Sequence, residues 1–149
     1  MDHWIKIDIR QNWATAFRQT PPLVGISVDN KQLFSAVKPG DILWFYSIKP
    51  VRGIIGFGKI AKKYKDEKKP VFMPELRMRK VLLPFRFELK DIRLFEEKLW
   101  VENHINIGDF RLTWTEEFQP LLDAHSKKLI TRAERRFRLE FKEYLNAKN

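Results

Sequence analysis

Basic residues that could hold phosphate groups are concentrated in two parts of the sequence. Between residues 59 and 80 there are nine lysines and arginines against three acids, and from residue 126 onward there are eight against three. A net charge of +10 and a pI near 9.9 are typical of nucleic-acid-binding proteins, although solvated surface lysines also serve solubility. We expect the following side chains to bind phosphate: Lys62, Lys63, Lys65, Lys68, Lys69, Arg132, Arg135 and Arg136.

Aromatic rings are the second group that could bind a ligand. The chain has five tryptophans, three tyrosines and twelve phenylalanines, together 13% of its residues. A nucleobase stacked on such a ring gains about 1–3 kcal/mol, so rings beside a basic rim suit nucleic acid. Most of the phenylalanines fit the spacing of a hydrophobic core. The candidates for pocket walls are therefore Trp4, Trp13, Trp44, Tyr46, Trp100 and Trp114.

The sequence has no catalytic or metal-binding pattern. It contains no cysteine, and its three histidines, His3, His104 and His125, match no metal-ligand spacing. No serine lies in a Gly-x-Ser-x-Gly context, and no phosphate-loop Gly-Lys-Ser/Thr follows the glycines between residues 53 and 58. We therefore predict no metal, no cofactor and no enzymatic activity. A hydrolase would need an acid and a base brought together from distant segments.

Length and composition predict a single domain spanning residues 1–149. Apolar residues make up 44% of the chain and charged residues 32%, which excludes an intrinsically disordered protein. No apolar run is long enough for a transmembrane helix. The N-terminus lacks the basic and apolar regions of a signal peptide, so we expect a cytoplasmic protein.

Alternation and turn residues predict the elements of the N-terminal half. Residues 4–9 alternate as a half-buried strand, with isoleucines on one face and Trp, Lys and Asp on the other. Asn12 is a candidate N-cap for a helix that ends before the two prolines after residue 20, and a second short helix is expected over residues 30–37. Residues 42–46 are apolar throughout, as in a strand covered on both faces, and residues 53–60 should pair with them as a hairpin.

The C-terminal half is predicted to contain a loop, further strands and a long helix. Residues 62–74 are polar and rich in lysine, which indicates a mobile basic loop. Alternation predicts a strand over 81–89, with a bulge or sheet edge at its proline, and another over 92–95; residues 96–113 are ambiguous. Apolar spacings of three and four predict a helix around 130–144. The expected fold is α+β, a curved mixed β-sheet or small β-barrel with flanking short helices and a C-terminal helix.

Several motifs of the N-terminal part occur in a fixed order. The opening strand leads into Gln11-Asn12-Trp13, and Leu23-Val24-Gly25-Ile26 follows. Next come Lys38-Pro39-Gly40-Asp41, an apolar strand, a turn and a glycine-containing strand, and then Leu83-Pro84-Phe85-Arg86-Phe87. In this order and spacing, the chain up to about residue 95 resembles the EVE and YTH domains of the PUA-like superfamily, which recognise modified bases.

The resemblance implies a PUA-like fold with a pocket for one base. In this pocket the carboxamide of Asn12 would bind a flipped base, and backbone atoms of Val24 and Gly25 would bind its exocyclic amine, with Ser47 beside them. Helix capping is the alternative role of Asn12. Val24 stands where those families have a tryptophan that encloses the modification. Either the ligand is not a methylated purine, or stacking comes from one of these rings: Trp44, Tyr46 or Trp114.

The leading hypothesis is a non-catalytic module that binds DNA or RNA and recognises a base, modified or not, in a polar-aromatic pocket with a basic rim. Two alternatives remain open. One is a hydrolase or nuclease that acts on nucleic acid, of the ASCH/PUA-like type. The other is a protein-binding adaptor whose basic helix binds an acidic partner. The sequence indicates no membrane partner and does not define an oligomeric state.

Overall fold

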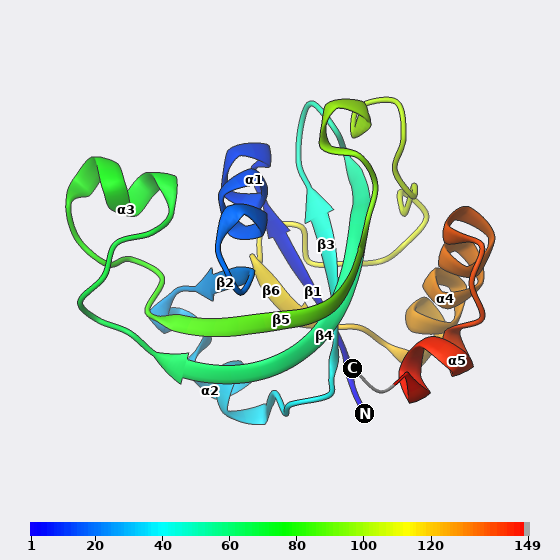
Figure 1. The fold of residues 1–149 in the computed structure, drawn as a ribbon, viewed down its shortest axis with the longest axis horizontal. Coiled ribbons are helices and arrows are strands. Elements are labelled where there is room, and N and C mark those ends of the chain that lie inside the picture. Colours follow the sequence, from blue (N-terminus) through cyan, green and yellow to red (C-terminus); the bar gives the residue numbers. More distant parts are fainter. Residues whose placement is uncertain (148–149) are drawn as a thin grey trace.

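A curved sheet of six strands, in the order β2-β5-β4-β3-β1-β6, forms the centre of the structure, a computed structural model that describes residues 1–147 (Figure 1). The strands are β1 (His3–Asp8), β2 (Leu23–Ile26), β3 (Ile42–Ser47), β4 (Gly53–Lys65), β5 (Phe85–Leu94) and β6 (Phe118–Pro120). The α-helices are α1 (Arg10–Arg18), α2 (Lys31–Ala36), α3 (Met73–Met78), α4 (Asp123–Phe137) and α5 (Phe141–Asn146). The predicted α+β fold with a curved mixed sheet is confirmed, since β1 and β3 are parallel and the other neighbours antiparallel.

Bulges and glycines allow the long strands β4 and β5 to curve. The register between them shifts twice, after Phe57 and after Ile60, and an extra residue in one strand bends and twists the pair. At Gly56 a Cβ atom would lie 2.3 Å from the carbonyl oxygen of Arg93, so only glycine permits this approach. The curved sheet places α1 inside its curve, whereas α4 and α5 lie on the outer side (Figure 1). The predicted β3–β4 hairpin is confirmed.

The first strand is more deeply buried than its alternating pattern predicts. It lies between β3 and β6, and the four residues from Trp4 to Ile7 are all buried. Lys6 was expected on a solvent-exposed face, but its side chain is 1% exposed. A charged residue tolerates this position because its ammonium group lies 3.2 Å from Asp8 and 3.3 Å from Glu117.

The predicted capping role of Asn12 is wrong. Helix α1 begins at Arg10 with Ile9 at the N-cap, which places Asn12 inside the first turn. The carboxylate of Asp8 accepts the backbone N–H of Ile9 at 2.7 Å and so supplies the acceptor near the helix start that was assigned to Asn12.

The boundaries of β4 and β5 differ from the sequence prediction. β4 continues to Lys65, paired with Phe85, so the start of the expected loop 62–74 is strand and its end belongs to α3. β5 is one strand from Phe85 to Leu94, which joins the two predicted strands. Residues 81–84 lie outside the sheet although their sequence alternates like a strand. The backbone N–H groups of Leu82 and Leu83 donate to the carboxylate of Glu75 in α3 instead of to a neighbouring strand.

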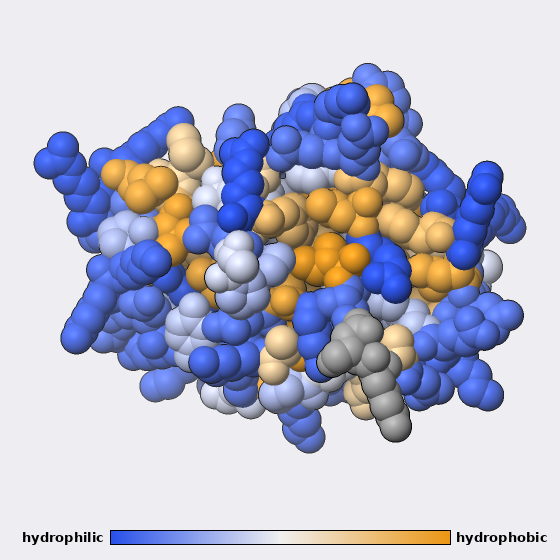
Figure 2. Space-filling view, viewed as in Figure 1, coloured by the Kyte–Doolittle hydropathy of each residue, from blue (hydrophilic) through white to orange (hydrophobic). Residues whose placement is uncertain are grey.

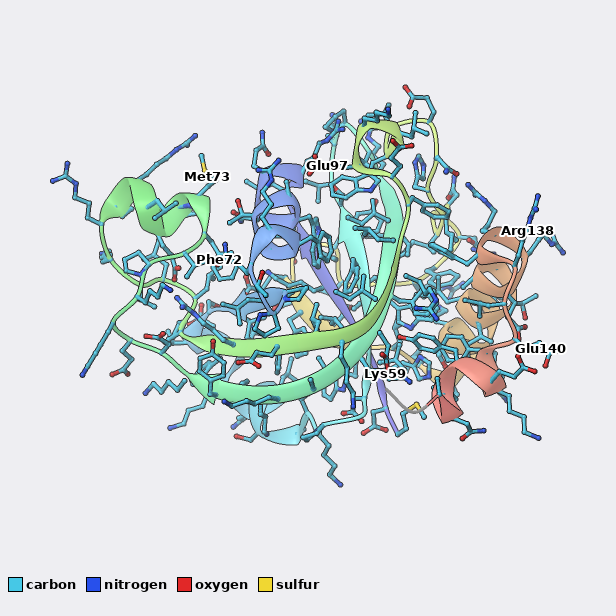
Figure 3. All side chains as sticks on the ribbon, in the orientation of Figure 1. Lys59, Phe72, Met73, Glu97, Arg138 and Glu140 are labelled. Atoms are coloured by element: carbon cyan, nitrogen blue, oxygen red, sulfur yellow. The ribbon has the colours of Figure 1, made fainter. Side chains whose placement is uncertain are left out.

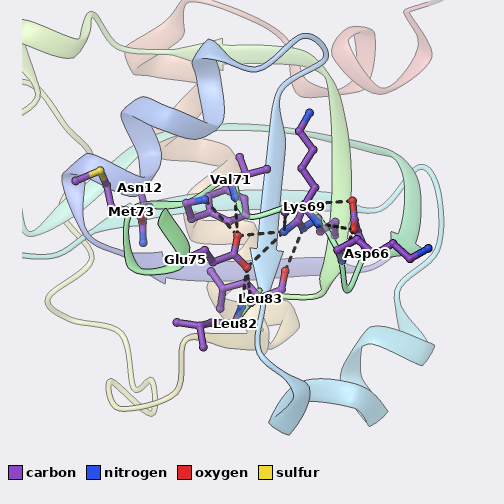
Figure 4. A network of polar contacts seen from close by, with 11 residues as sticks. Asn12, Asp66, Lys69, Val71, Met73, Glu75, Leu82 and Leu83 are labelled. Carbon is purple, nitrogen blue, oxygen red and sulfur yellow. Dashed lines mark hydrogen bonds and ion pairs between the residues drawn. The ribbon is translucent and has the colours of Figure 1, made fainter. Parts of the chain in front are cut away.

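Glu75 anchors residues 66–84, which we call the strap, against β2 and β5 (Figure 4). Its fully buried carboxylate accepts the guanidinium N–H of Arg86 at 3.1 Å, and Arg86 is itself 1% exposed. The same carboxylate accepts four backbone N–H groups at 2.8–3.3 Å, those of Val71, Phe72, Leu82 and Leu83. Both oxygens of the buried charge are therefore satisfied, which offsets the cost of removing it from water.

The expected C-terminal helix is two helices. The chain turns at Arg138, which has a φ of +53° and lies between the end of α4 and Glu140 (Figure 3). The turn lets Phe141 of α5 stack on Trp44, with ring centroids 5.9 Å apart. Lys59 of β4 fixes the end of α5, because its ammonium group donates to the carbonyl oxygen of Tyr144 at 2.7 Å.

The last strand, β6, was not predicted, and three residues are too few to show a period. It pairs antiparallel with β1 and closes that edge of the sheet. Within residues 1–147, no helix has the length and apolar character needed to cross a membrane.

Replacing Glu75 with glutamine is expected to lower the free energy of unfolding by about 3–5 kcal/mol. An amide can accept hydrogen bonds at only one of its two ends, and Arg86 would lose its buried counter-charge. Urea unfolding followed by tryptophan fluorescence measures the change. The control Glu67→Gln removes an ion pair with Lys65 whose side chains are 67% and 53% exposed, and should cost under about 1 kcal/mol. Equal losses in both variants would contradict the anchoring role.

Candidate nucleic-acid interface

The outward face of α4 carries a group of five cations. Three residues of this helix, Ser126, Leu129 and Ala133, are buried at spacings of three and four and turn the remaining positions outward. The bases on this face, which we call the α4 basic face, are Lys127, Lys128, Arg132, Arg135 and Arg136.

Arg132 is held rigidly in this face. Its guanidinium forms two hydrogen bonds with the carboxylate of Asp109, at 2.8 and 3.0 Å, and a third with the carbonyl oxygen of Asn106 at 2.8 Å. It also lies over the ring of Phe110, 5.1 Å from the centroid. The hydrogen bonds from Arg132 lower the pKa of Asp109 to about 2, so this carboxylate is ionised at neutral pH and balances one of the cations.

Arg136 has no acidic partner among residues 1–147. Its guanidinium donates to the carbonyl oxygen of His104 at 2.8 Å and to the side-chain oxygen of Asn103, and it lies 5.0 Å from the ring centroid of Phe95. Neutral acceptors fix the orientation of the group but leave its charge uncompensated. A guanidinium with a fixed plane loses little entropy when it binds a phosphate.

The side chain of Arg135 has no hydrogen bond or ion pair with another residue in the part of the chain that the structure describes. It lies between two hollows and lines both. The first, of about 360 Å³, is lined by Ile105, Asn106, Asp109, Arg132, Arg135 and Arg136. The second, of about 400 Å³, is lined by Lys127, Lys128, Thr131, Arg132 and Arg135. The two hollows therefore adjoin along a pair of arginines, an arrangement suited to successive phosphate groups.

The second predicted phosphate-binding group lies at the other end of the molecule. β4 ends at the left of Figure 1, on the same side of the molecule as α3, and α4 lies at the right. Lys63 donates to the carbonyl oxygen of Phe34 at 2.8 Å, and Lys65 forms an ion pair with Glu67 at 2.7 Å. The ammonium of Lys62 lies 5.5 Å from the ring centroid of Tyr64. The two basic groups therefore do not form one continuous site, and the lysines at 68 and 69 extend the second group into the strap.

Sequence reasoning missed a buried polar cluster around Lys6. Besides the ion pair with Lys6, Glu117 accepts the backbone N–H of Ser27 at 2.6 Å and the side-chain N–H of Asn30 at 2.8 Å. Burial alone would raise the pKa of Glu117, but Lys6 and the N–H of Ser27 outweigh it and hold the pKa below its ordinary value. Since Lys6 and Glu117 are far apart in sequence, no local pattern could have revealed the pair.

Comparison with solved structures finds proteins of similar fold. The ASCH protein of Zymomonas mobilis is similar with a TM-score of 0.60 and 13% identity, covering 87% of this chain and 94% of that chain. The fold of this chain resembles that of the ASCH protein. A serine-to-alanine variant of that protein has a TM-score of 0.57 at 13% identity, covering 88% of this chain and 96% of its own. A protein from Pseudomonas syringae has a TM-score of 0.53 at 14% identity, over 87% of this chain and 98% of its own.

At such low identity this likeness concerns the fold alone. The closer resemblance to EVE and YTH domains stays a prediction. No family model and no curated protein matches the sequence.

In the folded chain, the carboxamide of Asn12 forms hydrogen bonds with other parts of the chain. Its N–H donates to Asp8 at 2.8 Å, and its oxygen accepts the backbone N–H of Met73 in the strap at 3.2 Å (Figure 4). The side chain is 5% exposed. A base could bind Asn12 only after the strap had moved.

Three further residues of the predicted pocket lie in the interior. Trp44 is fully buried, and its indole N–H donates to His3 at 2.9 Å, so this ring has no free face for a base. Val24 is 3% exposed. A Cβ atom at Gly25 would lie 2.7 Å from the ring of Phe72, which covers this glycine. Packing of α5 and of the strap therefore covers the residues that the sequence analysis assigned to the base pocket.

Tyr46 and Trp114 are the two predicted pocket rings that reach the surface. Their centroids are 5.0 Å apart, Tyr46 is partly buried, and Trp114 is 43% exposed. Burial raises the pKa of Tyr46, which keeps the phenol neutral at physiological pH. The hydroxyl of Ser47 is fully buried and has no hydrogen-bond partner in the described structure. Of the predicted set, Trp114 therefore offers the ring face most accessible to a base.

A carboxyl NMR titration should give a pKa of about 2 for Asp109. This folded-state value lies below the roughly 3.9 of an unfolded chain, so the pair stabilises the fold above about pH 4 and its contribution is lost as the pH falls toward 2. In Arg132→Gln, the pKa of Asp109 should return toward the ordinary value. Asp66, whose pKa is lowered by the backbone N–H groups of Lys68 and Lys69, should not change. A pKa near 4 for Asp109 in the parent protein would rule out the fixed ion pair.

Proposed function

We propose that this protein is a nucleic-acid-binding module without catalytic activity, and that the α4 basic face binds the phosphate backbone. The observation that carries the proposal is the pair of adjoining hollows that share Arg132 and Arg135. The net charge of +10 acts in the same direction, because it attracts a polyanion over distances beyond direct contact. Nucleic acid as the partner is supported by the motifs of the N-terminal part, which resemble those of base-reading members of the PUA-like superfamily.

The arginines of this face favour phosphate over a general acidic surface. Arg136 is oriented by neutral acceptors and by the ring of Phe95, whereas Arg132 is oriented by the carboxylate of Asp109 and by the ring of Phe110. A planar guanidinium in a fixed orientation matches the paired oxygens of a phosphodiester. Arg135 is then free to contact a phosphate in either hollow.

We further propose that an unpaired base stacks on Trp114. The ring is exposed, and Tyr46 packs behind it at 5.0 Å and limits its movement. Stacking of this kind tolerates any base, so a preference for a modified base would need a second contact. Asn12 would supply that contact only if the strap released it.

Arg135→Ala is expected to weaken binding of a fluorescein-labelled single-stranded RNA and to reduce the salt slope, the dependence of log affinity on log salt concentration, by about 1. Fluorescence anisotropy at several salt concentrations measures both. Lys98→Ala, which removes an exposed cation outside both hollows, is the control and should change neither. After incubation with Mg²⁺ the RNA should be recovered intact. Binding that ignores salt would refute phosphate binding, and cleavage abolished by one acid or histidine substitution would refute the non-catalytic proposal.

Trp114→Ala is expected to weaken the same binding by about 1–3 kcal/mol without changing its salt slope, because the ring contacts a base and not a phosphate. Val101→Ser, at an exposed apolar residue, is the control and should bind like the parent protein. The measurement is repeated with oligonucleotides that carry a modified base. A preference for the modified base that is lost in Asn12→Ala would assign base recognition to Asn12 instead of Trp114.

A further inference from the structure

The strap presents apolar side chains to solvent at the end of the molecule opposite to α4. Leu76 is 53% exposed and Met78 is 59% exposed, although both belong to a short helix. In Figure 2 apolar side chains appear over α3, surrounded by hydrophilic ones. The anchoring by Glu75 keeps these side chains in place, because the same helix turn that buries the carboxylate directs its neighbours outward.

A hollow of about 450 Å³ lies between α3 and the start of α1. Its walls come from Ile9, Gln11, Met73, Pro74, Arg77 and Met78. Met73 lies on the side of α3 that faces α1 (Figure 3). Methionine side chains are flexible and polarisable and adapt to apolar groups of different shape. The hollow therefore suits one aliphatic side chain of a partner.

A second hollow, of about 280 Å³, continues from the first along α1. The two share Gln11 and Met73, and the second also contains Arg10, Arg18 and Glu97, so its bases outnumber its acid. Arg18 forms a long ion pair with Glu97, at 3.6 Å, and its side chain is 71% exposed. The two hollows thus form one groove, which we call the α1–α3 groove, with an apolar end and a basic end.

The strap, which forms one wall of this groove through Met73, Pro74, Arg77 and Met78, carries more bases than acids. Within residues 1–147, none of the side chains of Lys68, Lys69, Arg77, Arg79 and Lys80 forms an ion pair. The acids of the same segment are already engaged. Asp66 accepts the N–H groups of Lys68 and Lys69, Glu67 pairs with Lys65, and Glu75 is buried with Arg86.

These features select one kind of occupant. A second copy of this chain, with a net charge of +10, would be repelled. Nucleic acid would find no aromatic ring among the lining residues of either hollow on which to stack a base. A concave site receives one protruding side chain better than it receives a lipid surface.

We propose that the α1–α3 groove binds an acidic peptide segment of a partner protein, with one aliphatic anchor in the methionine-lined hollow and carboxylates over the surrounding bases. The site is separate from the α4 basic face, so both can be occupied at once and neither proposal depends on the other. The apolar anchor provides the affinity and the charges provide orientation and speed of association.

The three methionines of the chain, Met1, Met73 and Met78, allow a direct test. The full chain is labelled with ¹³C at the methionine methyl groups and titrated with the acetylated peptide Gly-Asp-Glu-Asp-Leu-Asp-Glu-Asp-Gly. Saturable shifts of the Met73 and Met78 signals are expected, while Met1 stays unchanged. Parallel peptides carry serine in place of leucine, or lysine in place of each acid, and both should bind at least about tenfold more weakly.

Variants separate the groove from the rest of the surface. Met78→Ser and Arg77→Glu should each weaken peptide binding by about tenfold, with Met73 as the remaining reporter. Leu122→Ser, at a residue that is 67% exposed beside α4, is the control and should bind the peptide like the parent protein. All three sites are exposed, so the melting temperatures should match, and RNA binding by Met78→Ser should be unchanged.

Any of four results overturns the proposal. These are an absence of saturable shifts, equal binding of the leucine and serine peptides, equal loss of binding in Leu122→Ser, and shifts at Met73 and Met78 caused only by RNA or by phosphatidylglycerol vesicles. Failure of RNA binding alone leaves the peptide titration intact, so the two proposals fail separately.

Discussion

The carboxylate of Glu75 accepts four backbone N–H groups and the guanidinium of Arg86 in a site closed to solvent, and the geometry of one end of the molecule depends on it. Because a buried charge is tolerated only when all its acceptors are used, the strap has one well-defined position. That position places Met73 against Asn12 and Phe72 over Gly25. The same buried charge therefore closes the predicted base pocket and forms the α1–α3 groove.

Elements defined by local pattern were predictable from the sequence. The alternation and turns that fix the β3–β4 hairpin, and the spacing of Trp13 and Phe17 in α1, are properties of neighbouring residues. Features that depend on distant residues were not predictable. Residues 81–84 alternate like a strand, but their backbone bonds to Glu75 instead of joining the sheet. The helical spacing continues through residue 138, although the positive φ of that residue ends the helix there. β6 is shorter than one period of any pattern.

The candidate interface shows the same division. Composition and spacing predict a basic C-terminal helix, but they do not show which of its cations lack an ion-pair partner. Asp109 neutralises Arg132 from a segment without clear periodicity, whereas Arg135 is left without a partner among the described residues. The same holds for the aromatic rings. A tryptophan such as Trp44 could stack on a base, and only the packing of Phe141 against it shows that its indole belongs to the core. Residue type thus indicated the chemistry, and tertiary contacts decided its availability.

The turn at Arg138 divides the C-terminal region into two helices with different contacts. Before it, α4 directs charge toward solvent; after it, α5 directs aromatic rings toward β3 and β4, where Lys59 secures the last turn. Since one short connection joins the two helices, the helix that carries the guanidinium groups is tied to the sheet through α5. A phosphate chain that docks there would meet a preformed surface, and little ordering entropy would be lost on contact.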